Sequence, residues 1–284
     1  IFVIGNILLK TTFKLGIKST SKNNKFTELK KKNKLLIFNV PLESSSKCNI
    51  NLSRVRNYIF KSFEIAHDLA IRKKIVGIIN APIDKKIFKG QYLGVTEYLS
   101  KKNKSKNKEV MFLYNKRLSV VPLTTHIEIK DVAKKITFNL IKMKVITLNK
   151  SYLKLFKKKP KIAILGLNPH NSENKKISIE NRIIKPTVKK LKKLKINIEG
   201  PFPADTAFNK KKLIAYDVLV GMYHDQVLGP FKALYGYDAI NITLGLKYLR
   251  LSPDHGTAKD IVGLNKANPQ SLISAINFLD KIND

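Results

Sequence analysis

Three of the chain's five histidines stand at the end of an apolar, strand-like run. His126 closes VVPLTTH, His170 closes IAILGLNPH and His224 closes DVLVGMYH. In an open α/β sheet, ligands gather just beyond the carboxyl ends of the strands, so residues placed in this way converge on one crevice. Three neutral imidazoles around one divalent metal ion, with one coordination position left for a substrate, form a catalytic rather than a structural site. The residues therefore predict a metalloenzyme.

Apolar runs alternate with helical patterns along the chain, and this alternation predicts α/β architecture. The predicted strands are Leu35–Val40, Ile75–Asn80, Val110–Tyr114, Leu118–Leu123, Lys161–Leu167, Asp217–Met222 and Ala239–Leu244. The predicted helices are Arg54–Lys73, Asp131–Lys144, Ile177–Leu194 and Pro269–Ile282. No internal repeat and no linker rich in Gly, Ser or Pro divides the chain. We therefore expect residues 1–284 to form one unit of two interleaved lobes that share a central sheet.

The composition predicts a globular protein whose metal ligands are nitrogen and oxygen atoms. A chain of 284 residues with 43% hydrophobic residues can bury a large core. Its single cysteine, Cys48, excludes an intramolecular disulfide and a cysteine-cluster zinc site, and fits a reducing compartment. No apolar run approaches the roughly 18 to 20 residues that cross a bilayer. The opening IFVIGNILL also lacks signal-peptide flanks, so we expect a cytoplasmic protein with no membrane partner.

The formal net charge of +35 suggests a nucleic-acid partner, because clustered lysines neutralise phosphates. Only six of the 55 basic residues are arginines, however, whereas base and phosphate recognition favours the bidentate arginine side chain. We therefore expect solvated lysine-rich faces and weak, non-specific polyanion binding, with no specific nucleic-acid partner. The lysine runs are Lys30–Lys34, Lys101–Lys108, Lys154–Lys161 and Lys189–Lys195.

The richest segment lies between Gly221 and Gly263 and contains GMYHDQ, Lys232, NITLGL, Arg250 and PDHGTAKDIVG. Together with PLTTHIEIKDV, GLNPH, GPFPADTAF and NAPIDK earlier in the chain, this segment resembles the 4-hydroxythreonine-4-phosphate dehydrogenase family of vitamin B6 biosynthesis. The resemblance covers nearly the whole chain. It implies the two-lobed fold of the isocitrate and isopropylmalate dehydrogenases, a homodimer with the active site built between subunits, and an NAD or NADP cofactor. No GxGxxG sequence follows a strand, so an ordinary Rossmann fingerprint is absent.

The activity that the resemblance implies is oxidation and decarboxylation of 4-phosphooxy-L-threonine to 3-amino-2-oxopropyl phosphate. The family's metal ligands correspond to His126, His170 and His224. A cation there would lower the pKa of the substrate alcohol and stabilise the charge left by decarboxylation. With imidazole ligands, zinc or cobalt is expected over magnesium, although an added oxygen ligand would broaden that preference.

The remaining candidate site residues come from the same motifs. The resemblance implies that the substrate is bound by Thr96, Lys232, Asn241 and Arg250, and that His255, Gly256 and Thr257 help to bind the cofactor. Lys232, Asp205 and Asp225 are the candidates for steering protons or orienting a ligand, and the sequence does not identify the general base. His67, within FEIAHDLAI, is expected to be structural.

Three departures from the family pattern bear on activity. Val95 stands where the family has a histidine in GHTE, which removes a polar substrate contact. The loop 171–181 keeps Glu173 and Glu180 but lacks the family's glycines, and losing a glycine from a position of positive φ forces a loop to rearrange. The family's opening strand is also missing before Ile1, so we expect that the natural N-terminal segment is absent.

Two alternatives to the leading function follow from these departures. Val95 suggests a sister dehydrogenase that acts on 4-phosphoerythronate or phosphothreonate. The altered loop and the missing start suggest a decayed, non-catalytic protein that binds polyanions through its basic surface.

Overall fold

The computed structural model describes residues 2–5, 18–19, 36–42, 51–88, 90–105, 108–173 and 175–283. Cys48 and the lysine run Lys30–Lys34 lie outside the described residues. The chain divides into two compact units. The first unit comprises Ile1–Ile75 with Asp84–Gln91, and the second comprises Val76–Ile83 with Tyr92–Asp284. All the candidate site residues belong to the second unit.

The strands are β1 (Phe2–Gly5), β2 (Lys18–Ser19), β3 (Leu36–Asn39), β4 (Gly77–Ile79), β5 (Val110–Tyr114), β6 (Ser119–Pro122), β7 (Ile162–Leu165), β8 (Ile198–Phe202), β9 (Val218–Gly221), β10 (Ile240–Leu244) and β11 (Leu249–Pro253). The α-helices are α2 (Leu52–Ile71), α3 (Val95–Asn103), α4 (Ile129–Lys135), α5 (Phe138–Phe156), α6 (Lys185–Lys193), α7 (Ala204–Ala207), α8 (Lys210–Ala215), α9 (His224–Tyr235) and α10 (Gln270–Asn283). Shorter turns of helix are η2 (Lys85–Phe88), η3 (Pro169–Ser172), η4 (Glu180–Ile184) and η5 (Lys259–Ile261).

The first unit combines a small parallel sheet, in the order β1-β3-β2, with the long helix α2. Helix α2 begins at Asn51, whose side chain accepts a 2.8 Å hydrogen bond from the backbone N–H of Ser53. This capping contact satisfies one of the unpaired donors at the helix start. Phe60 on α2 packs edge-on against Phe88 of η2, with ring centroids 5.8 Å apart.

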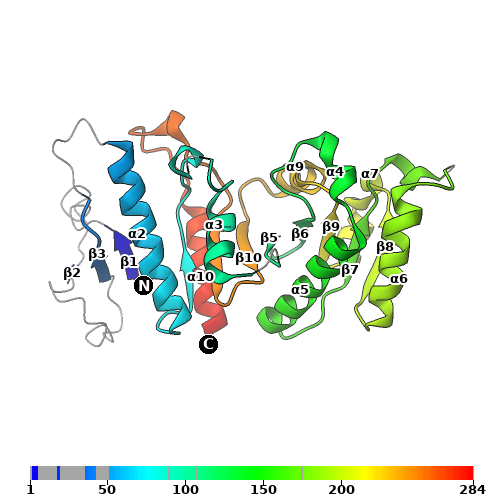
Figure 1. Ribbon diagram of the computed structural model, residues 1–284, viewed down its shortest axis with the longest axis horizontal. Coiled ribbons are helices and arrows are strands. Elements are labelled where there is room, and N and C mark those ends of the chain that lie inside the picture. The colour runs from blue at the N-terminus through cyan, green and yellow to red at the C-terminus, as the bar shows by residue number, and fades with distance from the viewer. Residues whose placement is uncertain are drawn as a thin grey trace. The chain divides into compact units, whose positions relative to one another are not determined.

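The second unit is built on an eight-stranded sheet in the order β4-β11-β10-β5-β6-β9-β7-β8 (Figure 1). Strands β6, β9, β7 and β8 run parallel to one another, and β4 runs parallel to β11, while the pairs β11–β10, β10–β5 and β5–β6 are antiparallel. All residues of β6, β7 and β9 are buried. Strands buried on both faces carry continuous apolar runs instead of alternating ones, which is why these segments were recognisable in the sequence.

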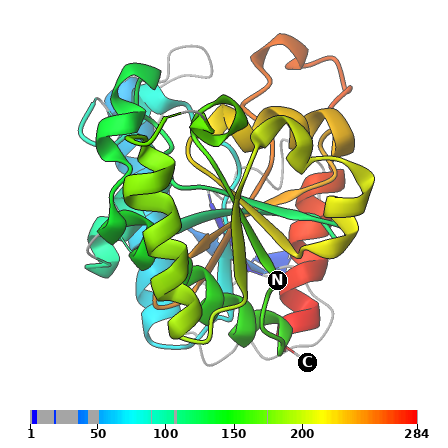
Figure 2. The same ribbon diagram turned by 90° about the vertical axis from the view of Figure 1, so that its right-hand side faces the viewer.

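Helices cover both faces of this twisted sheet (Figure 2). On one face, Val218 and Val220 of β9 belong to the apolar cluster that includes residues of α5 and α6. On the other face, Leu219 lies between them in sequence and belongs to the cluster that includes Val227 and Phe231 of α9. Alternate residues of one strand therefore attach different helices, and α9 is held directly over the strands that precede the histidines.

The seven predicted strands all occur, with ends that differ by at most two residues from the predicted ones. The sequence predicted one continuous helix over Asp131–Lys144. This prediction is wrong, because α4 ends at Lys135 and α5 begins at Phe138. The side chain of Thr137 accepts a hydrogen bond from the backbone N–H of Leu140 and caps the new helix. In the part of the chain that is described, no helix is long and apolar enough to cross a membrane.

Candidate functional site

The three histidines predicted as metal ligands follow three neighbouring parallel strands. His126 follows β6, His224 follows β9 and His170 follows β7, and the sheet order places β9 between the other two. The carboxyl ends of these strands therefore form one edge of the sheet, called the strand-end edge below. This arrangement is the one that the sequence predicted from the apolar runs.

The rings of His126 and His224 lie near each other, with their centroids 6.5 Å apart. In each ring, Nδ1 faces a carboxylate. It lies 3.1 Å from Oε1 of Glu97 in His126, and 2.6 Å from Oδ1 of Asp225 in His224. Because an ionised carboxylate only accepts hydrogen bonds, each Nδ1 must carry the proton, and in the neutral ring Nε2 keeps a free lone pair. A carboxylate behind the imidazole in this way is typical of metal-binding histidines.

His170 lies in a loop with an unusual backbone conformation. It lies in η3 and is exposed, and the backbone φ angles of His170, Asn171 and Ser172 are 49°, 55° and 53°. Three consecutive residues without a glycine thus adopt the left-handed conformation, which costs energy for side-chain-bearing residues. Asn171 and Ser172 open the loop 171–181, for which the sequence predicted a rearrangement.

Glu180 holds the loop that carries His170, and its role was not recognised in the sequence. Its side chain is fully buried, and Oε1 accepts hydrogen bonds from the backbone N–H groups of Leu167 and Asn168 at 3.0 and 2.8 Å. Burial raises the pKa of this carboxyl, but the hydrogen bonds from Asn168 and Ser178 outweigh that effect and lower the pKa overall. An acidic residue that opens a helical segment 10 residues after a strand-end histidine would have been the available signal.

Gln226 joins the loops that carry His224 and His170, and it was also missed. This buried side chain of α9 accepts a 2.7 Å hydrogen bond from the backbone N–H of Met222 through Oε1. Its amide nitrogen donates a 2.7 Å bond to the carbonyl oxygen of Gly166. One side chain therefore bridges the carboxyl ends of β9 and β7.

Arg250 is the most deeply buried of the predicted substrate-binding residues, with 4% of its surface exposed. Its Nε donates a 2.7 Å hydrogen bond to Asn80 Oδ1, and Nη1 lies 3.0 Å from Thr243 Oγ1 and 3.4 Å from Thr96 Oγ1. Burial lowers the pKa of Arg250 to about 10, against the opposing influence of Glu97. The guanidinium thus keeps its charge at neutral pH, and two of the predicted residues, Arg250 and Thr96, are in contact.

Lys232 pairs with Asp254, a residue that the sequence motifs did not single out. Lys232 Nζ lies 3.2 Å from Asp254 Oδ1, while Asp254 Oδ2 is buried without a hydrogen-bond partner among the described residues. Burial raises the pKa of Asp254, and the charge and hydrogen bond of Lys232 oppose that rise only in part. A buried carboxyl group therefore holds the side chain of Lys232.

The other predicted site residues lie on further elements of the second unit. Asn241 lies on β10, and its Oδ1 is buried without a hydrogen-bond partner in the described chain. Asp205 lies on α7, which contacts η3, and its Oδ1 accepts a hydrogen bond from the backbone N–H of Thr206. His255 Nδ1 lies 2.9 Å from the carbonyl oxygen of Gly256, and Gly256 and Thr257 are exposed. His67 lies on α2 in the first unit.

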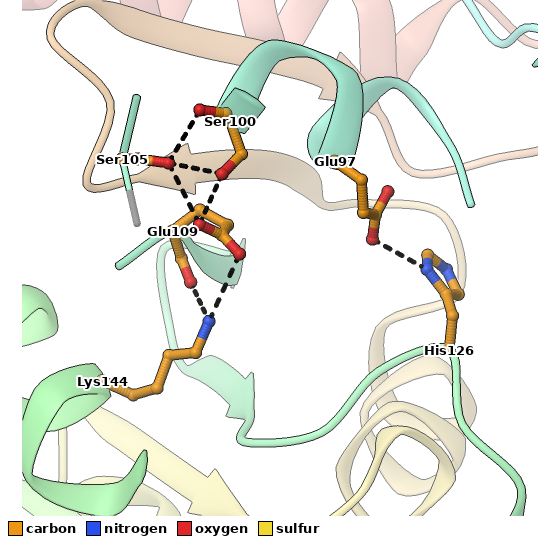
Figure 3. A network of polar contacts seen from close by, with 6 residues as sticks. All are labelled: Glu97, Ser100, Ser105, Glu109, His126 and Lys144. Atoms are coloured by element: carbon orange, nitrogen blue, oxygen red, sulfur yellow. Dashed lines mark hydrogen bonds and ion pairs between the residues drawn. The ribbon is translucent and has the colours of Figure 1, made fainter. Parts of the chain in front are cut away.

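Glu97 connects the contact between Arg250 and Thr96 to His126. It follows Thr96 in the first turn of α3, and Figure 3 shows its carboxylate directed at His126. Farther along the same helix, Ser100 donates a 2.6 Å hydrogen bond to Glu109, whose backbone carbonyl accepts a bond from the largely buried Lys144. Helix α3 is therefore held by a second polar network away from the His126 contact (Figure 3).

The donors at the strand-end edge fit a divalent cation in part. His126 and His224 present two imidazoles with carboxylates behind them, a combination suited to zinc or cobalt. Among the described residues, however, no three His, Cys, Asp or Glu side chains lie close enough together to hold a metal ion. His170 follows the adjacent strand, and the binding of a metal by all three histidines stays a prediction.

A family model described as "Pyridoxal phosphate biosynthetic protein PdxA" matches residues 2–279 of the chain. The chain belongs to this family. A match over nearly the full length agrees with the resemblance drawn from the motifs between Asn80 and Gly263. The predicted α/β fold with a shared central sheet is likewise confirmed by solved structures of related proteins.

Curated relatives are named 4-hydroxythreonine-4-phosphate dehydrogenase. The protein of Sulfurihydrogenibium sp. is 46% identical over 73% of this chain and 65% of its own length. That of Bradyrhizobium diazoefficiens is 39% identical over 72% of this chain and 62% of its own length. The Wigglesworthia glossinidia brevipalpis protein is 35% identical over 96% of this chain and 84% of its own length. The chain thus matches a little under two thirds of the length of the first two relatives.

Solved structures of other proteins also superpose on the chain, at lower sequence identity. The 4-hydroxythreonine-4-phosphate dehydrogenase of Klebsiella pneumoniae superposes with a TM-score of 0.84 at 28% identity, covering 100% of this chain and 90% of that one. A terephthalate 1,2-cis-dihydrodiol dehydrogenase from Burkholderia xenovorans superposes with a TM-score of 0.67 at 18% identity, covering 98% of this chain and 88% of that one. The second comparison shows a common fold alone.

Proposed function

We propose that the chain is a metal-dependent, NAD- or NADP-linked oxidoreductase of pyridoxal phosphate biosynthesis. Its proposed reaction is oxidation and decarboxylation of 4-phosphooxy-L-threonine to 3-amino-2-oxopropyl phosphate and carbon dioxide, with hydride passing to the nicotinamide. The observation that carries this proposal is the pairing of family membership with two imidazoles 6.5 Å apart at the strand-end edge.

The substrate is proposed to lie between the histidines and the cluster around Arg250. Arg250 and Lys232 supply positive charge for the substrate's phosphate and carboxylate groups. Thr96 keeps its hydroxyl hydrogen available as a donor, because its oxygen accepts from Arg250. Asn241 offers a buried amide oxygen that accepts no hydrogen bond from the described residues. Such groups orient a phosphorylated hydroxy amino acid, so that its alcohol faces the histidines.

His126, His224 and His170 are the proposed metal-binding residues, with zinc preferred over cobalt or magnesium. The chemistry that a bound cation supplies at such a site is Lewis acidity, which lowers the pKa of a nearby alcohol. Glu97 and Asp225 hold protons on the imidazole Nδ1 atoms of His126 and His224. Asp205 and Asp225 remain candidates for moving protons, and the exposed segment His255–Thr257 is proposed to contact the nicotinamide cofactor.

The test is the initial rate of NADH formation by purified, zinc-loaded protein with 4-phosphooxy-L-threonine. We expect turnover in the unchanged protein and in His67→Gln, which removes a histidine that follows none of the three strands. We expect turnover to disappear in His224→Ala while its circular dichroism spectrum stays unchanged. A folded, zinc-loaded protein that forms no NADH would refute the proposed reaction.

A second candidate function is oxidation of 4-phosphoerythronate or phosphothreonate by the same fold. The observation that favours it is Val95, which precedes Thr96 at the start of α3 and carries no polar group. The substrates are distinguished by comparing kcat/KM for each in the unchanged protein and in Val95→His. A rise in kcat/KM for 4-phosphooxy-L-threonine alone on Val95→His would support the family reaction with a weakened substrate contact.

We also propose a homodimer, from the family resemblance, and a cytoplasmic location, which the single cysteine of the sequence favours. Sedimentation velocity of the purified protein tests the oligomeric state, and a monomer at micromolar concentration would contradict it. The described runs Lys154–Lys161 and Lys189–Lys195 contain exposed lysines, which agrees with solvated faces instead of a specific nucleic-acid site.

A further inference from the structure

We propose that Glu97 is a positioning residue that fixes the tautomer and orientation of His126. The carboxylate accepts a hydrogen bond from Nδ1–H and leaves Nε2 as the atom that faces a ligand. This inference deepens the proposed function at His126, and it rests on that function in naming a divalent cation as the ligand. The nearby Thr96 had been singled out in the sequence, whereas Glu97 had not.

The contact is specific to one pair of atoms. Glu97 Oε1 lies 3.1 Å from Nδ1 of His126, and the two side chains are 28% and 32% exposed. Among the described residues, Glu97 is the one hydrogen-bond partner of the His126 ring. Residues 126–130 are all exposed, so little packing orients this ring. The direction of the imidazole therefore depends on the carboxylate.

The surroundings of Glu97 keep it in place. It belongs to the first turn of α3, where the positive end of the helix dipole favours an acidic side chain. The opposite end of α3 is held by the network of Ser100, Glu109 and Lys144 (Figure 3).

Helix α3 thus joins two functions in adjacent residues. Thr96 accepts a hydrogen bond from Arg250, and Glu97 accepts one from His126. A shift of the helix start would move both contacts together, so the position of Arg250 and the orientation of His126 are linked through one turn of helix. Glu97 contributes to metal binding through the imidazole and not as a ligand itself.

The test uses Glu97→Gln, which keeps the side-chain shape but can either donate to or accept from Nδ1. The matched control is Glu128→Gln, which removes the same charge two residues from His126. Among the described residues, the Glu128 carboxylate pairs only with the exposed Lys130, at 2.5 Å. The first measurement is the ¹⁵N–¹H spectrum of the histidine rings in metal-free protein. We expect the Nδ1–H tautomer of His126 in the unchanged protein and in the control, and a mixture of tautomers in Glu97→Gln.

The second measurement is zinc affinity, obtained by competition with a chromophoric chelator in the absence of substrate. Loss of a carboxylate behind a metal-binding histidine weakens binding by about 10- to 100-fold, so we expect that range for Glu97→Gln and a change below about twofold for the control. In a His126→Ala background, Glu97→Gln should have no further effect, because its route to the metal is gone.

Two results would overturn the assignment. One is a single, unchanged His126 tautomer in Glu97→Gln together with unchanged zinc affinity. The other is an equal loss of affinity from Glu97→Gln with and without His126, which would mean that the carboxylate acts by charge or by folding alone. Neither measurement requires turnover, so failure of the proposed reaction and failure of this inference are separate outcomes.

Discussion

Gln226→Glu replaces the amide nitrogen of a buried side chain by an oxygen. In the native protein this nitrogen donates a 2.7 Å hydrogen bond to the carbonyl oxygen of Gly166, while Oε1 accepts one from Met222. The substitution leaves the second bond intact and places two acceptors against each other in the first. Because only 9% of Gln226 is exposed, water cannot replace the lost donor easily.

The expected loss of stability follows from two contributions. The missing hydrogen bond costs about 1 kcal/mol. Burial beside a carbonyl oxygen raises the pKa of the new carboxyl, and a rise of about two units from an unperturbed ~4.3 costs a further ~2.7 kcal/mol at pH 7. We therefore expect the free energy of unfolding to fall by about 3 to 4 kcal/mol at pH 7.

The sign of the pH dependence is fixed by the same reasoning. Below the unfolded pKa of about 4.3, the carboxyl is protonated in both states and its O–H can donate to Gly166. The stabilising contribution is present there and is lost as the pH rises through the raised folded-state pKa, at about 6 for the assumed shift. The deficit relative to the unchanged protein should thus fall below about 1 kcal/mol at pH 4.

Urea unfolding followed by circular dichroism at pH 4 and pH 7 measures both values. The control is Gln270→Glu, which makes the same change on an exposed glutamine in the first turn of α10, where a negative charge is tolerated. Its unfolding free energy should stay within about 0.5 kcal/mol of the unchanged protein. A Gln226→Glu deficit at pH 7 no larger than that of the control, or one equal at both pH values, would refute this reasoning.

Three further substitutions test other contacts of the second unit by urea unfolding. Burial raises the pKa of Asp217, but its hydrogen bond with Lys158 outweighs this and lowers the pKa overall. Asp217→Asn should therefore cost about 1 to 2 kcal/mol at pH 7, and the cost should shrink as the pH falls below about 4; a constant cost would contradict it. Ser271→Ala removes a buried hydroxyl that links the start of β10 to the loop after β11, and should cost about 1 to 3 kcal/mol at any pH. Glu180→Gln should loosen the loop after β7 and speed its cleavage in limited proteolysis, while unchanged cleavage would show that Glu180 does not hold the loop.

The sequence predicted the parallel strands well because burial on both faces gives each one an uninterrupted apolar run. Strands β8 and β11 were missed because neither has an uninterrupted apolar run. The segment IEGPF of β8 contains Gly and Pro, and LRLSP of β11 places the buried Arg250 among apolar residues. Helix α9 was missed because it contains Pro230 directly after a glycine, a pair that normally ends a helix.

The sequence predicted those site residues whose position follows from the strand that they directly follow. The histidines belong to that class, since their position in the chain already fixes their place on the sheet. Glu97, Gln226 and Asp254 act through partners that are distant in sequence, such as Lys232 for Asp254. No local pattern marks such a contact, because it is created by the crossing of elements and not by their own periodicity.

The antiparallel strands in the sheet of the second unit are paired over unequal lengths, which bears on how the sheet would respond to force. Strand β5 pairs with β10 along its whole length, from Val110 to Tyr114, but with β6 only at Leu113 and Tyr114. Tension applied across the sheet would separate the β5–β6 pair before any other antiparallel pair, because it is the shortest. That separation would leave Arg250 and Asn241 on one side and the three histidines, with Lys232 of α9, on the other. One short strand pair therefore lies between two of the residues proposed to hold the substrate and those proposed to hold the metal.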